Sequence, residues 1–424
     1  MRSRYSIFAL LITTAVVLLG FSGVIYAKTE LVYWIHGYEP AVVANKEIIQ
    51  QFEALYPDVN IRFDYVPHDD FETKLFTAFA AGVGPDVYWI ADNVFPQMLE
   101  SDMVDAVMPS AFGVDSQAEF ETLFEPGALE AFKVDGTLYT AGISEYNTLS
   151  VYYDKAAFRE AGLPYPSATE PMTVAEFIEL GQKLTKIEKN RRIRSGIEFE
   201  WRLPNWISQT VEPWVRQLGG ELVDPETGMP QFDSEEVITV VQLLQDLVFK
   251  YETSDPAFVL QDHVEDFAYG RVAMVLGGPF HMGFTRGLKP DMEIGVMPFP
   301  VFEGSPRVTT KYSWAWMVNP HSRNRELAWK FAAFAATEHQ GLWWNNVRFI
   351  QPLKGKMDQL IEAEPLMETF VADFEYSKYQ FSSTQYYELA HILLQAVSEV
   401  TSAPVDVRQV MERAQKEALG AVGL

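Results

Sequence analysis

Polar and aromatic side chains stand where apolar runs of this sequence end, at positions suited to ligand recognition. The run 31–36 is rich in β-branched and aromatic residues and reads as a strand that ends at His36, before a glycine turn and Tyr38. Asp92 and Asn93 directly follow a second short apolar run. In α/β proteins, ligands bind where a strand ends at a loop before a helix. The chemistry predicted here is therefore binding at the edge of a sheet.

The composition excludes several classes of site and partner. Cysteine is absent, so we expect no disulfide framework, no thiol chemistry and no cysteine-bearing zinc site. The formal net charge of −25 repels phosphate backbones, which disfavours nucleic acid as a partner. The chain contains 10 Trp, 19 Tyr and 29 Phe, and rings in or near loops suit ligands that have an apolar face and a polar rim.

A catalytic set is not recognisable in the sequence. It contains no Gly-x-Ser-x-Gly, no His-Glu-x-x-His, no P-loop and no complete Gly-x-Gly-x-x-Gly. A glycoside hydrolase needs only two suitably placed carboxylates, and the 58 Asp and Glu residues leave that alternative open. We expect no cofactor and no metal, and the motifs alone do not exclude a hydrolase.

Strands and helices alternate along the chain, which predicts an α/β fold of mostly parallel sheets flanked by helices. Helical spacing of apolar residues predicts a helix near 43–56, and Thr173-x-x-Glu176 forms a capping box before another helix. Asp233 or Ser234 can cap a further one. The expected strands are 31–36, 60–66, 87–91, 272–276, 294–297 and 313–318.

The first 27 residues have the pattern of a secretory signal peptide. Arg2 and Arg4 precede an apolar run at 7–19, and small residues lead up to Ala27, where we expect cleavage. An uncleaved membrane anchor is the alternative, because the uncharged stretch is long enough to span a bilayer. An exported protein without a lipid-carrying cysteine needs a compartment to retain it, so we expect a periplasmic location.

Several segments together resemble the extracellular solute-binding proteins of ABC importers, in their sugar-binding, maltose-binding-protein-like branch. The matching segments are 31–37, 80–87, Asp92-Asn93, 149–155, 273–280 and 324–328. They occur in the order of the family and span nearly the whole chain after the export segment.

The resemblance implies a two-lobed periplasmic-binding-protein fold of type II, with a ligand cleft between the lobes and a hinge of crossing strands. Lobe one would comprise 28–146 and 298–322, and lobe two 147–297 and 323–424. Ligand would favour a closed state, because it contacts both lobes only there. The closed form, a monomer, would dock on the transmembrane permease subunits of the importer. The resemblance thus implies a binding protein rather than an enzyme.

The resemblance also assigns ligand contacts, in which a sugar stacks on a ring and offers its hydroxyls to carboxylates and amides. Asp92 matches a sugar-binding aspartate of the family and Phe280 a stacking tryptophan. Tyr38 and Glu39 replace an acid and a lysine, which argues against maltose itself. The predicted ligand-binding residues are His36, Tyr38, Glu39, Asp92, Asn93, Asn147, Trp201, Trp206, Phe280, Trp314, Arg348 and Tyr387.

Structural roles are the alternative for many of these positions. Asp92 could cap a helix, Arg348 could form a surface ion pair, and His36 could be a half-buried strand histidine. Trp314 and Trp316 lie two residues apart and therefore share a face of their strand, with Trp314 the expected contact.

The residues after 144 suggest how the first crossing strand meets a ligand. Because side chains alternate along a strand, Glu145 and Asn147 share one face and Tyr146 lies on the other.

Ligands other than sugars remain open. The adjacent tyrosines 386–387 resemble the pair with which ferric-ion binders hold metal, the acidity would suit a polyamine, and relatives also bind phosphorylated polyols. The predicted loops hold mainly Asp, Glu, Asn and aromatic residues rather than converging Arg or Lys, which favours a neutral sugar. An adhesive surface protein is disfavoured, because the chain has no repeats or linker tracts.

Overall fold

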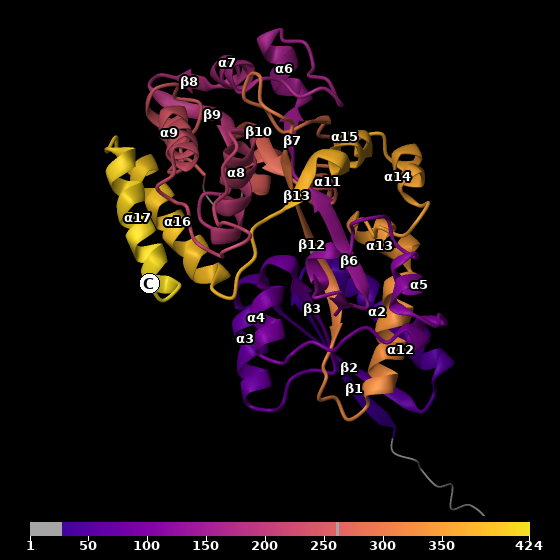
Figure 1. Cartoon of the computed structure of the whole chain (residues 1–424). Coiled ribbons are helices and arrows are strands. Elements are labelled where there is room, and N and C mark those ends of the chain that lie inside the picture. Colours follow the sequence, from indigo (N-terminus) through magenta and orange to yellow (C-terminus); the bar gives the residue numbers. More distant parts are fainter. Residues whose placement is uncertain (1–27, 260–262) are drawn as a thin grey trace, which may run out of the picture.

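The computed structural model describes residues 28–259 and 263–424, which form two lobes joined by crossing strands (Figure 1). The predicted export segment 1–27 lies outside the described residues. The elements up to the first crossing are β1 (Thr29–Gly37), α2 (Glu39–Leu55), β2 (Val59–Pro67), α3 (His68–Ala80), β3 (Val87–Ala91), η1 (Asp92–Val94), α4 (Phe95–Glu100), η2 (Pro109–Phe112), α5 (Gln117–Glu121), η3 (Glu130–Phe132), β4 (Lys133–Val134), β5 (Thr137–Leu138) and β6 (Gly142–Thr148).

The first lobe is built on a sheet in the order β13-β12-β3-β1-β2, with β6 paired to β12. β1 runs parallel to β2 and β3, as expected from strand–helix alternation. Its inward side chains are fully buried, and the Tyr33 hydroxyl donates to Oδ1 of Asn45 at 2.7 Å while accepting from the Trp316 indole at 3.1 Å. This buried chain of hydrogen bonds fixes α2 and β12 to β1 and so positions the ends of the strands.

The second lobe has a five-stranded sheet in the order β11-β7-β10-β9-β8. The predicted capping box at Thr173 and Glu176 is present, and Ser234 rather than Asp233 caps α9. The elements from the first crossing to the second are β7 (Ser150–Asp154), α6 (Lys155–Ala161), α7 (Val174–Leu184), β8 (Lys186–Glu188), β9 (Arg191–Glu198), α8 (Pro204–Gln217), α9 (Glu235–Phe249), α10 (His263–Ala268), β10 (Val272–Gly277), α11 (Phe280–Leu288) and β11 (Ile294–Met297).

The lobes are joined by ordered strands rather than a flexible tether, as predicted. β6 belongs to the first sheet and β7 to the second, and only Leu149 separates them. The chain returns from β11 in the second sheet to β12 in the first, and Figure 1 shows β6 and β12 running side by side between the lobes. The remaining elements are β12 (Thr309–Val318), α12 (Arg325–Thr337), α13 (Gln340–Val347), α14 (Met357–Ala363), α15 (Met367–Asp373), η4 (Phe374–Tyr376), β13 (Ser377–Tyr379), α16 (Tyr386–Ser402) and α17 (Val407–Ala421).

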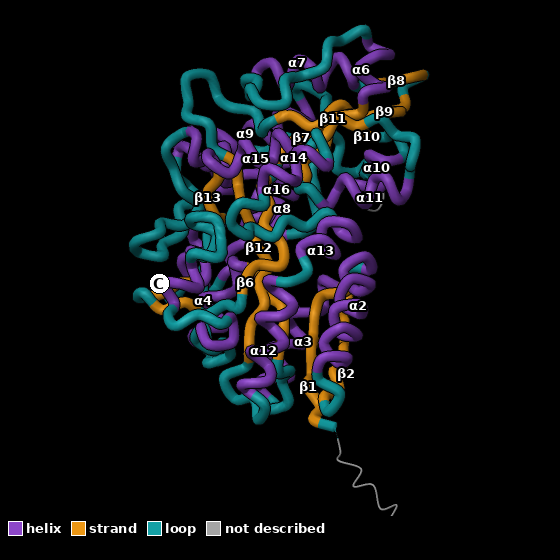
Figure 2. Tube along the Cα trace, turned by 90° about the vertical axis from the view of Figure 1, so that its right-hand side faces the viewer, coloured by secondary structure: helices purple, strands orange, loops and turns teal. Residues whose placement is uncertain are grey.

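Both sheets are mixed, whereas the sequence predicted mostly parallel pairing. β12 lies antiparallel to both β3 and β6, and β7 lies antiparallel to β10 and β11. The reason is the crossing itself: a strand that leaves one sheet for the other enters it against the direction of its neighbours. The two-lobed α/β architecture is as expected, with helices flanking each sheet (Figure 2).

The C-terminal helices are divided between the lobes. α12 packs against β12, β6 and α2, and α13 packs against α2, while α16 and α17 pack against helices of the second lobe. We therefore propose that the second segment of lobe one extends beyond the expected residue 322 to the end of α13. No helix in the described parts of the chain combines the length and the apolar character needed to cross a bilayer.

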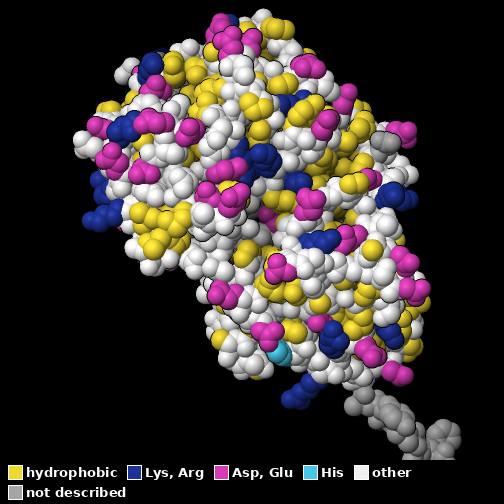
Figure 3. All heavy atoms as spheres, viewed as in Figure 1, with side chains coloured by type: hydrophobic (Ala, Val, Ile, Leu, Met, Phe, Trp, Pro, Cys, Tyr) yellow, Lys and Arg dark blue, Asp and Glu magenta, His cyan; other side chains and the backbone are white. Residues whose placement is uncertain are grey.

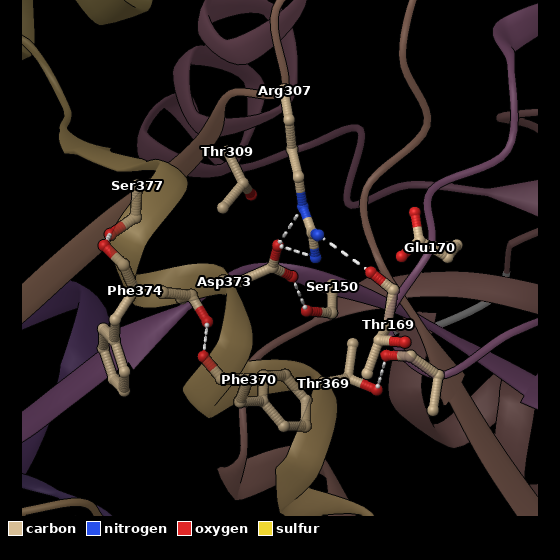
Figure 4. A network of polar contacts seen from close by, with 12 residues as sticks. Ser150, Thr169, Glu170, Arg307, Thr309, Thr369, Phe370, Asp373, Phe374 and Ser377 are labelled. Atoms are coloured by element: carbon tan, nitrogen blue, oxygen red, sulfur yellow. Dashed lines mark hydrogen bonds and ion pairs between the residues drawn. The ribbon is translucent and has the colours of Figure 1, made fainter.

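A buried polar network anchors the second crossing to the second lobe (Figure 4). The Arg307 guanidinium donates to Oδ1 of Asp373 from Nε at 3.1 Å and from Nη2 at 2.8 Å, and to the Thr169 carbonyl at 2.8 Å. The Ser150 hydroxyl donates to the other Asp373 oxygen at 2.9 Å. Three chain segments thus meet at one carboxylate, immediately before β12, and the Thr169 carbonyl joins a fourth to the guanidinium.

Candidate functional site

A cavity of about 570 Å³ lies between the two lobes. The first lobe and the crossing strands contribute His36, Gly37, Tyr38, Glu72, Ala91, Asn93, Glu145, Tyr312, Trp314 and Phe349. The second lobe contributes Glu200, Arg202, Leu203, Asn205, Trp206, Gln209, His263, Val264, Phe280, Phe284, Gln380 and Tyr387. Figure 3 shows the waist between the lobes, where hydrophobic, acidic and basic side chains meet at the surface.

Aromatic rings form the wall on the side of the first lobe. Tyr38 reaches the cavity because β1 ends at Gly37 and α2 begins one residue after Tyr38. A Cβ on Gly37 would lie 3.1 Å from the carbonyl oxygen of Val66, so the close β1–β2 contact favours glycine at this turn. The Tyr38 ring stacks on Phe349 with 5.9 Å between centroids. These rings offer apolar faces to whatever enters the cleft.

The floor of the cavity is formed where β3 ends beside β12. Asp92 lies beneath the surface, and its Oδ1 accepts a hydrogen bond from the Ser313 backbone N–H at 2.7 Å. Its neighbours Ala91 and Asn93 line the cavity. Asn93 is only 3 % exposed, and its Oδ1 has no hydrogen-bond partner among the described residues. A buried amide oxygen in this state is costly, and a ligand donor would satisfy it.

The crossing strand β6 adds a carboxyl to the floor. Glu145 lines the cavity, and the Asn147 side-chain amide donates to its Oε1. Tyr146, on the opposite face, stacks on Phe374 with 4.6 Å between centroids. The alternation predicted for these three residues is therefore present, and Glu145 is the member that reaches the cavity.

The wall on the side of the second lobe consists of Trp206 and Phe280. Trp206 lies in the first turn of α8, and Phe280 opens α11 after the Gly277-Gly278-Pro279 turn. Their rings meet edge to face with 6.3 Å between centroids. The Trp206 edge also packs on the buried ring of His263 at 4.9 Å, which holds the indole in place.

Glu200 and Arg202 form an ion pair beside this wall. Arg202 donates from Nε and Nη2 to the two Glu200 oxygens at 3.0 Å and 3.2 Å, and His263 Nδ1 lies 3.1 Å from Oε2. Burial would raise the pKa of Glu200, but the contacts with His263 and Arg202 outweigh it and lower the pKa to about 2. This carboxylate is therefore ionised and already neutralised by its neighbours.

Three other carboxyls at the site have pKa values that are raised instead of lowered. Burial raises the pKa of Glu72 and of Glu145 to about 8 each. Burial also raises the pKa of Asp92, which the hydrogen bond from Ser313 partly offsets, leaving it at about 7. At neutral pH these groups hold protons for much of the time, so each can donate as well as accept a hydrogen bond.

We expect the stability of the protein without added ligand to fall as pH rises through this range. A carboxyl whose folded pKa is about 8 and whose ordinary value is 4.5 binds more protons in the folded state between those values. The free energy of unfolding therefore decreases with rising pH, by up to ~1.4 kcal/mol per pH unit for each such group. Glu145→Gln should flatten the slope measured by urea unfolding between about pH 5.5 and pH 8.

The exposed Glu47 provides a control for that measurement, since Glu47→Gln removes a carboxyl outside the cavity. An unchanged slope in Glu145→Gln would show that this carboxyl does not titrate in the folded protein as described.

Seven of the twelve sequence-predicted contacts line the cavity together: His36, Tyr38, Asn93, Trp206, Phe280, Trp314 and Tyr387. They come from distant parts of the chain, so their convergence follows from the fold and from no local pattern. Their role as ligand contacts remains a proposal.

The other five lie elsewhere. Glu39 is exposed in the first turn of α2, and Asp92 lies just below the cavity surface. Asn147 is fully buried behind Glu145, and the Trp201 indole donates to Glu198 at 2.7 Å. Arg348 ends α13 at a positive φ of 66° and turns back to donate to the Trp344 carbonyl at 2.7 Å.

About two thirds of the lining residues were not among the predicted contacts. The missed polar residues are Glu72, Glu145, Glu200, Arg202, Asn205, Gln209, His263 and Gln380, and the missed rings are Phe284, Tyr312 and Phe349. One signal was available for Tyr312, because it lies two residues before Trp314 on the same strand and so shares its face. None was available for Gln380, which reaches the cavity from the segment between β13 and α16.

Known proteins resemble this chain in sequence and in fold. A family model described as bacterial extracellular solute-binding protein matches residues 40–341. An arabinooligosaccharide-binding protein of Halalkalibacterium halodurans is 26 % identical over 322 residues, an alignment that covers 73 % of this chain and 68 % of the relative.

Solved structures share the fold at low identity. An ABC substrate-binding protein from Listeria monocytogenes in complex with cycloalternan superimposes with a TM-score of 0.81 at 20 % identity, covering 94 % of this chain and 100 % of that one. UgpB from Mycobacterium tuberculosis, in complex with glycerophosphocholine, gives a TM-score of 0.77 at 18 % identity, covering 93 % and 98 %. The fold is thus common to proteins whose ligands differ in chemistry.

Proposed function

The chain belongs to the bacterial extracellular solute-binding protein family, whose members are non-catalytic receptors of ABC importers, and from this premise we propose that it captures a sugar or oligosaccharide in the cavity between its lobes. The observation that carries the proposal is the lining itself. Ring faces of Tyr38, Trp206 and Phe280 surround buried carboxyl and amide groups, as the apolar face and hydroxyl rim of a sugar ring require.

A ligand that contacts both lobes shifts the equilibrium between the open and closed conformations. A molecule that touches Tyr38 on one lobe and Trp206 on the other gains more contact when the lobes approach each other. It therefore shifts the population toward a closed state by its differential affinity for that state. The crossing strands β6 and β12 are the segments that would take up the hinge rotation.

The partner and the location follow from the same proposal. A closed, loaded receptor would deliver the sugar chemically intact to the transmembrane permease of the importer. Export by the segment 1–27 would place it in the periplasm. Relatives bind oligosaccharides, and the arabinooligosaccharide-binding protein of Halalkalibacterium halodurans supports a sugar over other solutes.

Two other ligand classes fit the cavity less well. A phosphate group needs converging cations, and Arg202 is the one Lys or Arg side chain among the described lining residues, where it is paired with Glu200. Ferric ion would need adjacent tyrosines on one surface. Tyr387 lines the cavity, whereas Tyr386 is fully buried with its hydroxyl 3.0 Å from the Ser208 hydroxyl.

A thermal-shift screen of the full chain lacking 1–27 against a panel of mono- and oligosaccharides tests the function. We expect at least one saccharide to raise the melting temperature in proportion to the logarithm of its concentration, since ligand at about 100 times its Kd stabilises the folded state by ~2.7 kcal/mol. Phe280→Ala should reduce that shift without lowering the melting temperature of the protein alone by more than a few degrees.

The screen also includes glycerophosphocholine, erythritol and spermidine as probes of the competing classes. A saturable shift with one of these and with no saccharide would contradict the proposed function.

A further inference from the structure

The charges that line the cavity are unbalanced toward the acidic side. Three glutamates, Glu72, Glu145 and Glu200, face one arginine. Arg202 is fully engaged by both oxygens of Glu200, which also faces His263. The two remaining carboxyls, Glu72 and Glu145, are therefore the groups whose partners decide the charge preference of the site.

Neither carboxyl has a cationic partner in the described structure. Glu72, in the first turns of α3, makes no ion pair or hydrogen bond to any described residue. Among the described residues the polar contacts of Glu145 are with neutral groups: it accepts from the Asn147 amide and lies close to the Tyr312 hydroxyl. Burial raises the pKa of both groups, as described above, and at Glu145 the contacts with Asn147 and Tyr312 offset the shift only in part. Among the described residues, therefore, neither acid group faces a cation.

Aromatic rings adjoin the Glu145 carboxyl. Glu145 on β6 pairs in register with Trp314 on β12, Tyr312 lies two residues along that strand, and Tyr38 lines the same cavity. Burial is the main reason that the pKa values of Tyr38 and Tyr312 are raised, and the charge of Glu145 raises both further. Tyr312 is 7 % exposed, and its hydroxyl lies close to the side chains of Glu145 and Asn147 without forming a hydrogen bond of ordinary geometry to any described residue. A carboxylate beside ring faces is the combination that attracts an ammonium group, by Coulomb and cation–π interaction together.

We propose, as a refinement that rests on the saccharide function above, that the cleft selects a saccharide carrying a protonated amine. The ammonium group would lie at Glu145, beside the rings of Tyr38 and Tyr312, with Glu72 adding to the negative potential. The Oδ1 atom of Asn93 would accept a hydrogen bond from a sugar hydroxyl, and the Tyr312 hydroxyl would donate one to the sugar. Neutral sugars would bind more weakly, because they offer no cation to stabilise the ionised form of either carboxyl.

The refinement has a thermodynamic signature that a neutral ligand lacks. A cation favours the ionised form of a neighbouring carboxyl, so a protonated Glu145 or Glu72 would release its proton to the buffer when the ammonium group binds. Binding enthalpies measured in buffers of different ionisation enthalpy would then differ in proportion to the number of protons released.

The experiment compares glucose, galactose and mannose with the corresponding hexosamines and N-acetylhexosamines, as monosaccharides and as β-linked dimers and trimers, by isothermal titration in phosphate and in Tris. We expect the best hexosamine-containing probe to bind about 10- to 100-fold more tightly than its neutral counterparts, with net proton release. Glu145→Gln should remove most of that preference and the proton release, whereas the control Glu47→Gln should retain both.

The outcomes separate this refinement from the function on which it rests. If neutral or N-acetylated probes bind as tightly as the hexosamines, or if no protons are released, the refinement is wrong and saccharide binding stands. If spermidine alone binds, or no sugar of any kind binds, both are wrong.

Discussion

Trp206→Ala will weaken binding of the best saccharide by about 30- to 700-fold, the loss expected when a buried tryptophan at the centre of an interface is truncated at a cost of ~2–4 kcal/mol. Trp206 is the largest side chain on the second-lobe wall of the cavity. It is held there edge to face by His263 and Phe280, so its orientation is set before a ligand arrives. A preorganised ring loses little conformational entropy on binding.

Isothermal titration of Trp206→Ala, Trp206→Phe and Tyr269→Ala measures this loss against matched changes. Trp206→Phe keeps a ring face and should lose less than about 10-fold. Tyr269 is an exposed aromatic residue of the same lobe, 62 % accessible and outside the cavity, so Tyr269→Ala should leave affinity within about 2-fold. An equal affinity for Trp206→Ala and the parent protein would mean that the ligand does not use this wall.

A double-mutant cycle with Phe280→Ala tests whether the two rings act as one surface. Because they contact each other, we expect the combined loss to be smaller than the sum of the single losses, with a coupling of about 0.5–1.5 kcal/mol. Independent additivity would place the two rings in separate subsites.

The strand-end residues could be predicted from sequence because a physical rule links them to the site. A strand that ends at a glycine or at a run of polar residues presents those residues at the sheet edge, and this holds for Tyr38, Asn93 and Phe280. The two tryptophans of β12 could be told apart by their positions along the strand. Trp314, nearer its start, reaches the cavity, whereas Trp316 is fully buried against Trp89.

Residues whose placement depends on tertiary packing could not be predicted in this way. Asn147 shares the face of Glu145, yet the Glu145 carboxyl lies between it and the cavity. Trp201 lies five residues from Trp206, but its indole N–H donates a hydrogen bond to Glu198 and does not reach the cavity. Phe349 and Gln380 come from segments that follow α13 and β13, and nothing in their local sequence indicates that they would line the cavity.

The mixed pairing of the sheets has a similar origin. Alternation of strands and helices predicts parallel neighbours when the connection returns to the same sheet. Here the chain leaves the first sheet after β6 and comes back as β12, and the direction of return is set by the second lobe rather than by a local crossover. A pattern of residues carries no information on that choice.

Arg307→Met should destabilise the second lobe by about 3 kcal/mol near pH 8, because it leaves Asp373 as an uncompensated buried charge. The Asp373 side chain is 1 % exposed and that of Arg307 15 %. The exposed pair of Arg159 with Glu293 is the matched control, since both side chains are more than half accessible and surface pairs contribute about 0–1 kcal/mol. Urea unfolding midpoints of Arg307→Met and Arg159→Met measure the two losses.

The pH dependence of the loss identifies its cause. Burial raises the pKa of Asp373 from an ordinary 3.8 to about 6, even though Arg307 opposes the shift. Without the guanidinium the folded-state pKa rises further above 6, so the deficit of the variant grows as pH increases and shrinks as Asp373 takes up a proton, which in the variant occurs above about pH 6. The deficit of Arg307→Met should therefore be smaller near pH 5 than near pH 8, and Arg307→Met/Asp373→Asn should recover most of it at pH 8. If the loss of stability is the same at both pH values, Arg307 acts through packing and through its hydrogen bond with Thr169. The charge pair with Asp373 would then not be what holds the second crossing strand in place.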